Sequence, residues 1–190
     1  MKACIIMGNT RAKSNTEALT KVFAETLEAK GVKVVQIPLR TKTVQSCVGC
    51  DKCHEKLDTF GCVINDDMHE VSQEILSSDL IVFTSPIYTW MPTPPVKAAM
   101  DRMFAYTKWP ADADQFNLMT DKTFAMISTS DDACETNCDL FDEAVRRLAS
   151  FANMPYLGHL CARGNEVKDT IEQKVLDDTK AFVEKCMRAF

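Results

Sequence analysis

Residues 2–16 of the chain read KACIIMGNTRAKSNT. The first six form a nearly continuous apolar run, which is typical of a strand covered on both faces of a parallel sheet. The run ends at Gly8, and a polar segment then leads into a helical pattern. A buried strand, a polar turn and a helix in this order indicate an α/β fold with a parallel sheet.

The same alternation of strand and helix repeats along the rest of the chain. Short apolar runs predict five strands, at Lys2–Met7, Lys33–Ile37, Leu80–Thr84, Thr123–Ser128 and Tyr156–Cys161. Helical periodicity predicts helices at Asn15–Lys30, Asp67–Ser77, Pro94–Tyr106, Leu140–Ala152 and Val167–Arg188. Five repeats favour a parallel sheet with helices on both sides, as one domain over residues 1–190 with a Cys-rich loop at about 41–66.

Composition restricts the class of partner. The 190 residues are 46% hydrophobic and 26% charged, with a net charge of -5 and a pI near 5.2. Without a basic cluster, nucleic acid is a poor candidate for the main partner. No apolar run has the length of a membrane span, and the one at the N-terminus is too short for a signal peptide. We therefore expect a cytoplasmic protein that binds neither nucleic acid nor membrane.

The loop after the first strand has the chemistry of a phosphate site. A helix N-terminus offers unpaired N–H groups and the positive end of the helix dipole, and both favour an anion. The side chains that add donors are those of Asn9, Thr10, Arg11, Ser14, Asn15 and Thr16. No G-x-G-x-x-G or G-x-x-x-x-G-K-[ST] motif occurs, which argues against a dinucleotide fingerprint and a triphosphate P-loop. The alternative is simple N-capping, with Ser14 and Glu17 as a capping box.

The loop after the third strand predicts a site for a planar ring. Residues 85–92 read SPIYTWMP, with two aromatic side chains at the edge of the sheet where open α/β folds bind ligands. Tyr88 and Trp90 would supply flat apolar surfaces for a flavin, and the backbone of residues 86–88 its amide contacts. The alternative is that these rings belong to the core or to a subunit interface.

Nine cysteines are the most unusual feature of the composition. Their number is odd and no secretory segment is visible, so a full disulfide framework is not expected. Cys47, Cys50, Cys53 and Cys62 form a compact C-x2-C-x2-C pattern with a later fourth thiol, typical of a [4Fe–4S] site. Free or redox-active thiols and a zinc site remain open, because the fourth cysteine follows after eight intervening residues. His54 is either a further ligand or, more simply, a solvated loop residue.

The remaining cysteines and histidines have simpler interpretations. Cys4, Cys161 and Cys186 lie in apolar runs and are expected to be small buried side chains. Cys134 and Cys138, four residues apart, are a weaker candidate for a redox pair. His69 and His159 are interpreted as ordinary helix-surface and strand-end residues. The run Asn65-Asp66-Asp67 is interpreted as the cap of a helix.

Taken together, these motifs resemble a known family. The sequence looks like the NAD(P)H-dependent FMN reductase and iron–sulfur flavoprotein branch of the flavodoxin-like superfamily. Four segments carry this resemblance: the loop Gly8–Thr16, the loop Ser85–Tyr88, the Cys-rich segment that ends in Asp66-Asp67-Met68, and the run through Met100, Asp101 and Arg102. The resemblance covers most of the first 105 residues. It implies a three-layer α/β/α sandwich with a five-stranded parallel sheet in the order 2-1-3-4-5.

The resemblance also implies site residues and a cofactor. The FMN phosphate would lie on residues 9–16, and the ring on Ser85, Pro86, Ile87, Tyr88, Thr89 and Trp90. The Ser128–Asp132 loop, with Ser130, would approach the other side. The family also implies a homodimer or homotetramer with Trp90, Met91 and the segment around Trp109 near an interface.

The function expected is that of an FMN-dependent oxidoreductase. It would take hydride from NAD(P)H and pass electrons to a quinone, a nitro or azo compound, or an iron–sulfur centre on the four clustered cysteines. The flavin carries this chemistry, so no catalytic side chain is assigned. The alternatives are a flavodoxin-type one-electron carrier and a zinc-binding interaction module.

Overall fold

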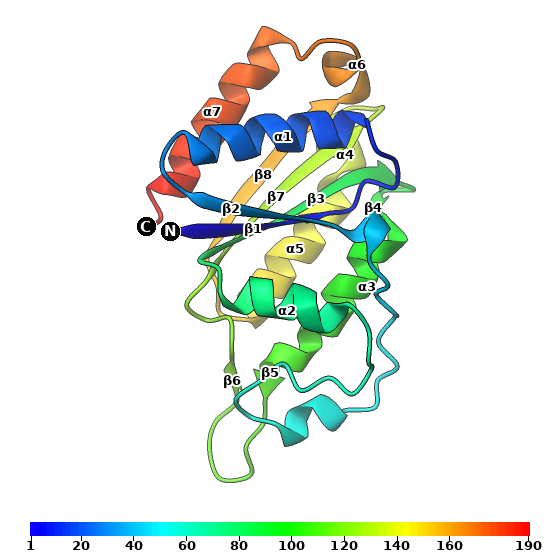
Figure 1. The fold of residues 1–190 in the computed structure, drawn as a ribbon. Coiled ribbons are helices and arrows are strands. Elements are labelled where there is room, and N and C mark those ends of the chain that lie inside the picture. Colours follow the sequence, from blue (N-terminus) through cyan, green and yellow to red (C-terminus); the bar gives the residue numbers. More distant parts are fainter.

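The computed structural model describes residues 1–190, and its centre is a parallel sheet with helices on both faces (Figure 1). The strand order is β2-β1-β3-β7-β8, and the strands are β2 Lys33–Pro38, β1 Lys2–Met7, β3 Leu80–Tyr88, β7 Thr123–Ser130 and β8 Tyr156–Arg163. This is the predicted flavodoxin-like order of five parallel strands. A sixth, short strand, β4 (Met91–Pro92), pairs antiparallel with β3 and was not predicted.

Two hydrophobic clusters hold the three layers together. On one face, α1 (Asn15–Glu28) and α7 (Gln173–Met187) pack on the sheet, and on the other face α2 (Met68–Leu76), α3 (Pro94–Arg102) and α5 (Asp139–Phe151) do so (Figure 1). Alternate residues of β1 contribute to the two clusters, Ala3 and Ile5 to the first and Cys4 and Ile6 to the second. Both faces of the strand are therefore buried, as its continuous apolar run predicts.

The helices differ from the expected ranges mainly at their C-terminal ends. The expected helix Pro94–Tyr106 is α-helical only to Arg102 and continues as the 3-10 helix η3 (Met103–Tyr106). The expected helix Val167–Arg188 is two helices, α6 (Gly164–Val167) and α7, separated by a turn in which the Glu172 N–H donates to the Glu166 carbonyl. A further short helix, α4 (Cys134–Asn137), follows β7.

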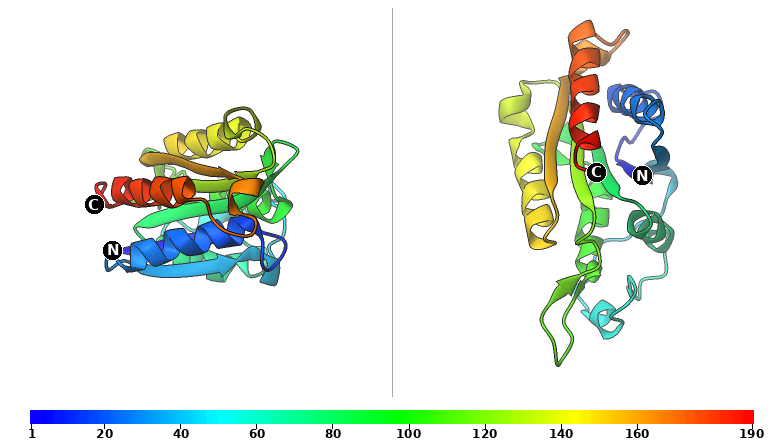
Figure 2. Two further views of the ribbon diagram at one scale, coloured as in Figure 1. Left: turned by 90° about the horizontal axis from the view of Figure 1, so that it is seen from above. Right: turned by 90° about the vertical axis from the view of Figure 1, so that its left-hand side faces the viewer.

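The Cys-rich segment extends away from the sheet. It contains the 3-10 helices η1 (Leu39–Thr41) and η2 (Lys52–Glu55), and with the two-stranded sheet of β5 (Thr107–Lys108) and β6 (Phe116–Asn117) it forms the end of the molecule farthest from α1 and α7 (Figure 1). Figure 2 shows the two termini close together at the opposite edge of the sheet from the β3–β4 turn. None of the helices has both the length and the apolar character needed to cross a bilayer.

Candidate functional site

A polar pocket of about 120 Å³ lies at the carboxyl edge of the sheet. It is lined by the loop after β1, the end of β3, the end of β7 and the start of α6. The lining residues are Asn9, Thr10, Arg11, Ser14, Asn15, Thr16, Pro86, Ile87, Tyr88, Thr129, Ser130, Asp131 and Gly164. The structure thus brings together at one pocket the two loops that the sequence marks out separately, together with Ser130.

The loop after β1 is closed by its own side chains. Ser14 is the N-cap of α1, and its hydroxyl accepts a hydrogen bond from the Glu17 N–H at 3.2 Å. The Glu17 carboxylate does not complete the expected capping box. Its Oε2 instead accepts from the Lys13 N–H at 2.9 Å and from Asn9 Nδ2 at 3.3 Å. These contacts shape the loop and leave the first N–H groups of α1, at Asn15 and Thr16, without intrahelical partners.

Further hydrogen bonds connect the β1 loop to the other walls of the pocket. The hydroxyls of Thr16 and Thr129 lie 2.6 Å apart, and Asn15 Nδ2 donates to the Gly164 carbonyl at 3.0 Å. At the β3 side, the Thr10 and Tyr88 hydroxyls are separated by 3.1 Å. The three strand ends are therefore held in one arrangement before a ligand binds.

Three of the expected cofactor residues lie outside this pocket. Ser85 is fully buried, and its hydroxyl accepts from the Thr93 N–H at 3.0 Å and donates to the Pro86 carbonyl at 2.8 Å. Thr89 and Trp90 form the two-residue turn between β3 and β4, with φ of 52° and 62°. The turn carries the Trp90 side chain to the surface, where it is 51% exposed. Tyr88 is therefore the aromatic residue that lines the pocket.

Three lining residues were not assigned from the sequence. Thr129 and Asp131 flank Ser130 in the Ser128–Asp132 segment. Their position at the end of a predicted strand could therefore have identified both as pocket residues. Gly164 enters the pocket because β8 runs beside β7, with Arg163 opposite Ser130. A Cβ atom on Gly164 would lie 2.9 Å from Asp131 Oδ1 and 3.1 Å from Asn15 Nδ2, so the absence of a side chain leaves part of the pocket open.

The pocket fits the polar part of FMN. The Arg11 guanidinium forms no ion pair within the chain, and it lies beside the N-terminus of α1, which favours a phosphate. The carboxylate of Asp131 and the hydroxyls of Thr129 and Ser130 suit the hydroxyl groups of a ribityl chain. The apolar surface available to a ring is the segment Pro86–Tyr88 at the rim.

The four clustered cysteines line a second, mostly apolar cavity. Its walls come from the Cys-rich segment and from the C-terminal end of α3, and they include Cys47, Cys50, Cys53 and Cys62. Cys53 is buried, Cys62 is partly buried, and Cys47 and Cys50 are exposed. Gly61, at φ 68°, brings Cys62 close to Cys53, because a Cβ on this glycine would lie 2.7 Å from the Cys53 carbonyl oxygen.

In this structure the four thiols are spaced too widely for a single zinc ion. A single zinc ion with sulfur ligands at about 2.3 Å requires sulfur atoms roughly 4 Å apart. No three of the four sulfur atoms lie within 4.8 Å of one another. A [4Fe–4S] cube takes one cysteine on each of four irons and therefore accepts a wider spacing. Four cysteines on one cavity are the donor set of that cluster.

A buried ion pair anchors the Cys-rich segment to α3. The side chains of Arg102 and Asp66 are 0% and 1% exposed, and Arg102 Nη1 lies 2.8 Å from Asp66 Oδ2. The same carboxylate accepts from the N–H groups of Gln45 and Met68, so it both caps α2 and fixes the start of the segment. Burial opposes ionisation of Asp66, but the hydrogen bonds from Arg102, Gln45 and Met68 outweigh it and hold the pKa of the carboxyl below its ordinary value.

His54 is not the solvated residue that the sequence suggested. Its side chain is 15% exposed and packs edge-on against Phe104 and Trp109, with ring centroids 5.0 and 4.2 Å away. Its Nδ1 lies 2.8 Å from the Thr107 carbonyl oxygen. Nearby, the buried ammonium of Lys108 donates to the Cys53 carbonyl at 2.9 Å. Both contacts join the Cys-rich segment to β5.

Of the scattered cysteines, Cys4 and Cys186 are buried free thiols as expected, but Cys161 is not. It forms a disulfide with Cys134, because β8 places Cys161 beside Ser128 of β7 and the chain after β7 folds back over it. Cys138, the other member of the weaker candidate redox pair, is a buried free thiol. His159, likewise, is partly buried, and desolvation lowers its pKa to about 4.

The doubly wound sheet, with a polar pocket at its carboxyl edge between three strand ends, defines a flavodoxin-like α/β protein. Comparison of the sequence with protein families agrees with this class. The model of the NADPH-dependent FMN reductase family matches residues 1–165, and the chain belongs to that family.

Comparison with individual proteins gives relatives whose names fit this family. The chain is 32% identical over 110 residues to an iron–sulfur flavoprotein of Archaeoglobus fulgidus, covering 58% of this chain and 49% of the relative. Over 172 residues, 90% of each chain, it is 20% identical to a putative NAD(P)H-dependent FMN-containing oxidoreductase of Bacillus subtilis. The chain thus spans about half the length of the iron–sulfur flavoproteins it matches.

Solved structures show the same fold. An FMN-dependent NADH-azoreductase from Bacillus anthracis in complex with FMN superposes with a TM-score of 0.68 at 18% identity, covering 99% of this chain and 98% of that one. At 18% sequence identity, this similarity shows only that the two proteins share a fold.

Proposed function

We propose that this protein is an NAD(P)H-dependent FMN oxidoreductase that passes electrons from its flavin to a second acceptor. The observation that carries the proposal is the pocket itself. It combines a helix N-terminus, a free guanidinium, hydroxyl side chains from two strand ends and an aromatic rim at Tyr88. Membership of the FMN reductase family supports the same cofactor.

The residues of this chain would bind and orient the cofactor. Arg11, Ser14 and the first N–H groups of α1 would hold the phosphate, and Thr129, Ser130 and Asp131 would contact the ribityl chain. Pro86, Ile87 and Tyr88 would lie beside the ring. Bound FMN would supply the hydride and electron chemistry, with no acid or base required from the protein.

The acceptor we favour is a [4Fe–4S] cluster on Cys47, Cys50, Cys53 and Cys62. The four thiols line one cavity, and the relatives include iron–sulfur flavoproteins. Arg102 lines the same cavity, where its charge is paired with that of Asp66. If the protein carries no cluster, quinones and nitro or azo compounds are the proposed acceptors. We also propose that the protein forms a homodimer or homotetramer through a surface that includes the exposed Trp90 and Trp109.

Flavin titration of an Arg11 variant tests the cofactor assignment. Arg11→Ala should weaken FMN binding roughly 10- to 150-fold, since a charge-assisted hydrogen bond contributes roughly 1.5–3 kcal/mol. Riboflavin, which lacks the phosphate, should bind both proteins alike. Lys21→Ala, which removes an exposed cation from the same helix outside the pocket, is the matched control. Equal loss of FMN and riboflavin affinity in Arg11→Ala would contradict the placement of the phosphate.

The electron donor is tested by anaerobic reduction of the flavin-loaded protein. NADH or NADPH should bleach the flavin absorbance in seconds. A stable semiquinone with slow bleaching would instead favour a one-electron carrier. Metal analysis that returns zinc, with no flavin taken up, would favour the interaction module.

A further inference from the structure

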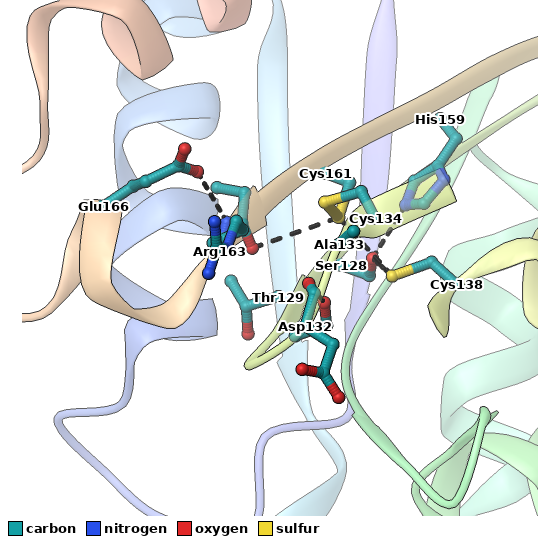
Figure 3. The surroundings of a disulfide bond; sticks show 12 residues. Ser128, Thr129, Asp132, Ala133, Cys134, Cys138, His159, Cys161, Arg163 and Glu166 are labelled. Carbon is teal, nitrogen blue, oxygen red and sulfur yellow. Dashed lines mark hydrogen bonds between the residues drawn. A yellow bond between two sulfur atoms is a disulfide. The ribbon is translucent and has the colours of Figure 1, made fainter. Parts of the chain in front are cut away.

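Three cysteine side chains from separate elements converge beside the proposed flavin pocket. Cys134 begins α4, Cys138 lies between α4 and α5, and Cys161 is in β8. Their sulfur atoms all lie within 4.8 Å of one another, and no other three cysteines of the chain are this close (Figure 3). Cys134 and Cys161 form a disulfide, while Cys138 is a free thiol whose Sγ lies 3.4 Å from that of Cys161.

Hydrogen bonds of the backbone hold these three residues in place independently of the disulfide. The Cys138 N–H donates to the Cys134 carbonyl at 3.1 Å, and the Asp142 N–H donates to the Cys138 carbonyl at 2.9 Å. The pairing of β8 with β7 sets Cys161 opposite Ser128, whose hydroxyl donates to Cys138 Sγ at 3.3 Å. Reduction of the disulfide would therefore leave three thiols close together.

The spacing of these three sulfur atoms suits a single metal ion. A zinc ion with sulfur ligands at about 2.3 Å requires sulfur atoms roughly 4 Å apart. The Cα atoms of Cys134 and Cys161 are 6.1 Å apart, so rotation of the two reduced side chains can bring their sulfur atoms to that separation. Thiolates favour Zn²⁺ over Mg²⁺ or Ca²⁺. Cys134 is partly exposed, so the solvent can supply water as a fourth ligand.

Buried side chains form the surroundings of this cluster. The Ser128 hydroxyl has one proton and donates it to Cys138, so the bond of 2.7 Å between Ser128 Oγ and His159 is donated by His159 Nε2–H (Figure 3). Hydrogen bonds of this kind orient the ligands of a metal ion. Burial raises the pKa of the Cys138 thiol, so this side chain is neutral in the metal-free protein and zinc must displace its proton.

We propose that the reduced protein binds one Zn²⁺ on Cys134, Cys138 and Cys161, and that the disulfide form is the metal-free state of this site. A dithiol compound supplies the two electrons and two protons that convert the Cys134–Cys161 disulfide to two thiols, and the compound itself becomes a disulfide. Zn²⁺ then bonds to the three sulfur atoms, and three protons pass to water. The site uses none of the residues proposed to bind FMN or the iron–sulfur cluster.

The position of the site gives the ion a structural role. Cys134 follows the pocket residue Asp131 by three residues, and Cys161 precedes Gly164 by three. The disulfide links these two walls of the pocket, and Zn²⁺ would restore the link after reduction. Because the ion binds the folded chain, it should also raise the stability of the reduced protein.

The first test is the zinc content of the reduced protein. The chain is reduced with a phosphine, freed of the reductant without oxygen, and dialysed against chelator-buffered Zn²⁺. Reduced wild type should hold one zinc ion more than reduced Cys138→Ala. Cys134→Ser, which changes a partly exposed residue and so spares the core, should show the same loss. Cys186→Ala removes a buried thiol in α7 and should match the wild type.

Alkylation followed by peptide mass mapping assigns the ion to particular residues. Zinc should slow the alkylation of Cys134 at least tenfold in the reduced wild type and should have no such effect in Cys138→Ala. Equal zinc content in the wild type, Cys138→Ala and Cys134→Ser would overturn the proposal, as would a Cys134 that zinc does not protect in the wild type. Neither measurement depends on flavin, so a failure to bind FMN would not change these results.

Discussion

At the scale of single residues, the ion pair between Arg102 and Asp66 has the clearest consequence. Removing one partner of a fully buried pair leaves the other charge without compensation, which costs about 3–5 kcal/mol. The contact also fixes both the start of α2 and the Gln45 end of the Cys-rich segment. A substitution that breaks this ion pair should therefore lower the stability of the protein and also disturb the arrangement of the four clustered cysteines.

Asp66→Asn should lower the free energy of unfolding by about 3 kcal/mol or more in urea denaturation. It should also reduce the yield of reconstituted iron–sulfur cluster. The control is Asp101→Asn, because Asp101 pairs with Lys97 on the surface of α3, the helix that carries Arg102, and such exposed pairs contribute about 0–1 kcal/mol. A change of similar size in both variants would contradict the role of Asp66.

The same pair predicts how stability depends on pH. The pKa of Asp66 is lower in the folded protein than its ordinary value of about 3.9. Its contribution is therefore complete above that value and is lost as the pH falls through the folded pKa. The difference in unfolding free energy between wild type and Asp66→Asn should be constant above about pH 5 and should shrink over the range from about pH 4 downwards. If the difference in unfolding free energy stays constant over this acidic range, the ionised Asp66 carboxylate is not the source of the stability difference.

At the scale of elements, the β3–β4 turn is a place where the sequence does not suit the backbone. Thr89 and Trp90 both have positive φ, which costs roughly 1–2 kcal/mol per residue for side chains other than glycine. A two-residue hairpin turn of this kind prefers Asn-Gly. The double variant T89N/W90G should raise the midpoint of thermal unfolding.

The same variant tests which residues of this loop contact the flavin. Thr89 and Trp90 lie outside the pocket, so FMN affinity should stay within about twofold of wild type. Tyr88→Ala, one residue earlier and inside the pocket, should weaken FMN binding. A loss of affinity in the double variant equal to that in Tyr88→Ala would place Trp90 against the ring after all.

The elements also show how far the sequence could be interpreted. Local patterns sufficed for the strand Lys2–Met7 and for the polar loop after it, because an apolar run and a helix start are encoded by neighbouring residues. Gly164 and the Cys134–Cys161 disulfide could not be found in this way. Both depend on the register between β7 and β8, which sets Cys161 opposite Ser128 and Arg163 opposite Ser130. That register is set by packing across the whole sheet.

At the scale of the whole molecule, the pocket connects the ends of β1, β3, β7 and α6, so a ligand there should stabilise the entire fold. Free FMN at 100 times its dissociation constant should add about 2.7 kcal/mol of stability. For a chain of this size, that is a rise of roughly 5–10 °C in the midpoint of thermal unfolding. Arg11→Ala at the same FMN concentration should show a smaller rise, and riboflavin should shift the two proteins equally.

Helix α3 begins and ends at the two proposed redox sites. At its N-cap, the Thr93 hydroxyl donates to the Gly8 carbonyl at 2.8 Å, and at its C-terminal end Arg102 contacts the carboxylate that anchors the Cys-rich segment. Nine residues at 1.5 Å each make a rigid spacer of about 13 Å. The length of this one helix therefore sets the separation between the loop after β1 and the anchored end of the Cys-rich segment. Inserting one residue would turn Arg102 by about 100° away from Asp66 and break the contact that anchors the Cys-rich segment.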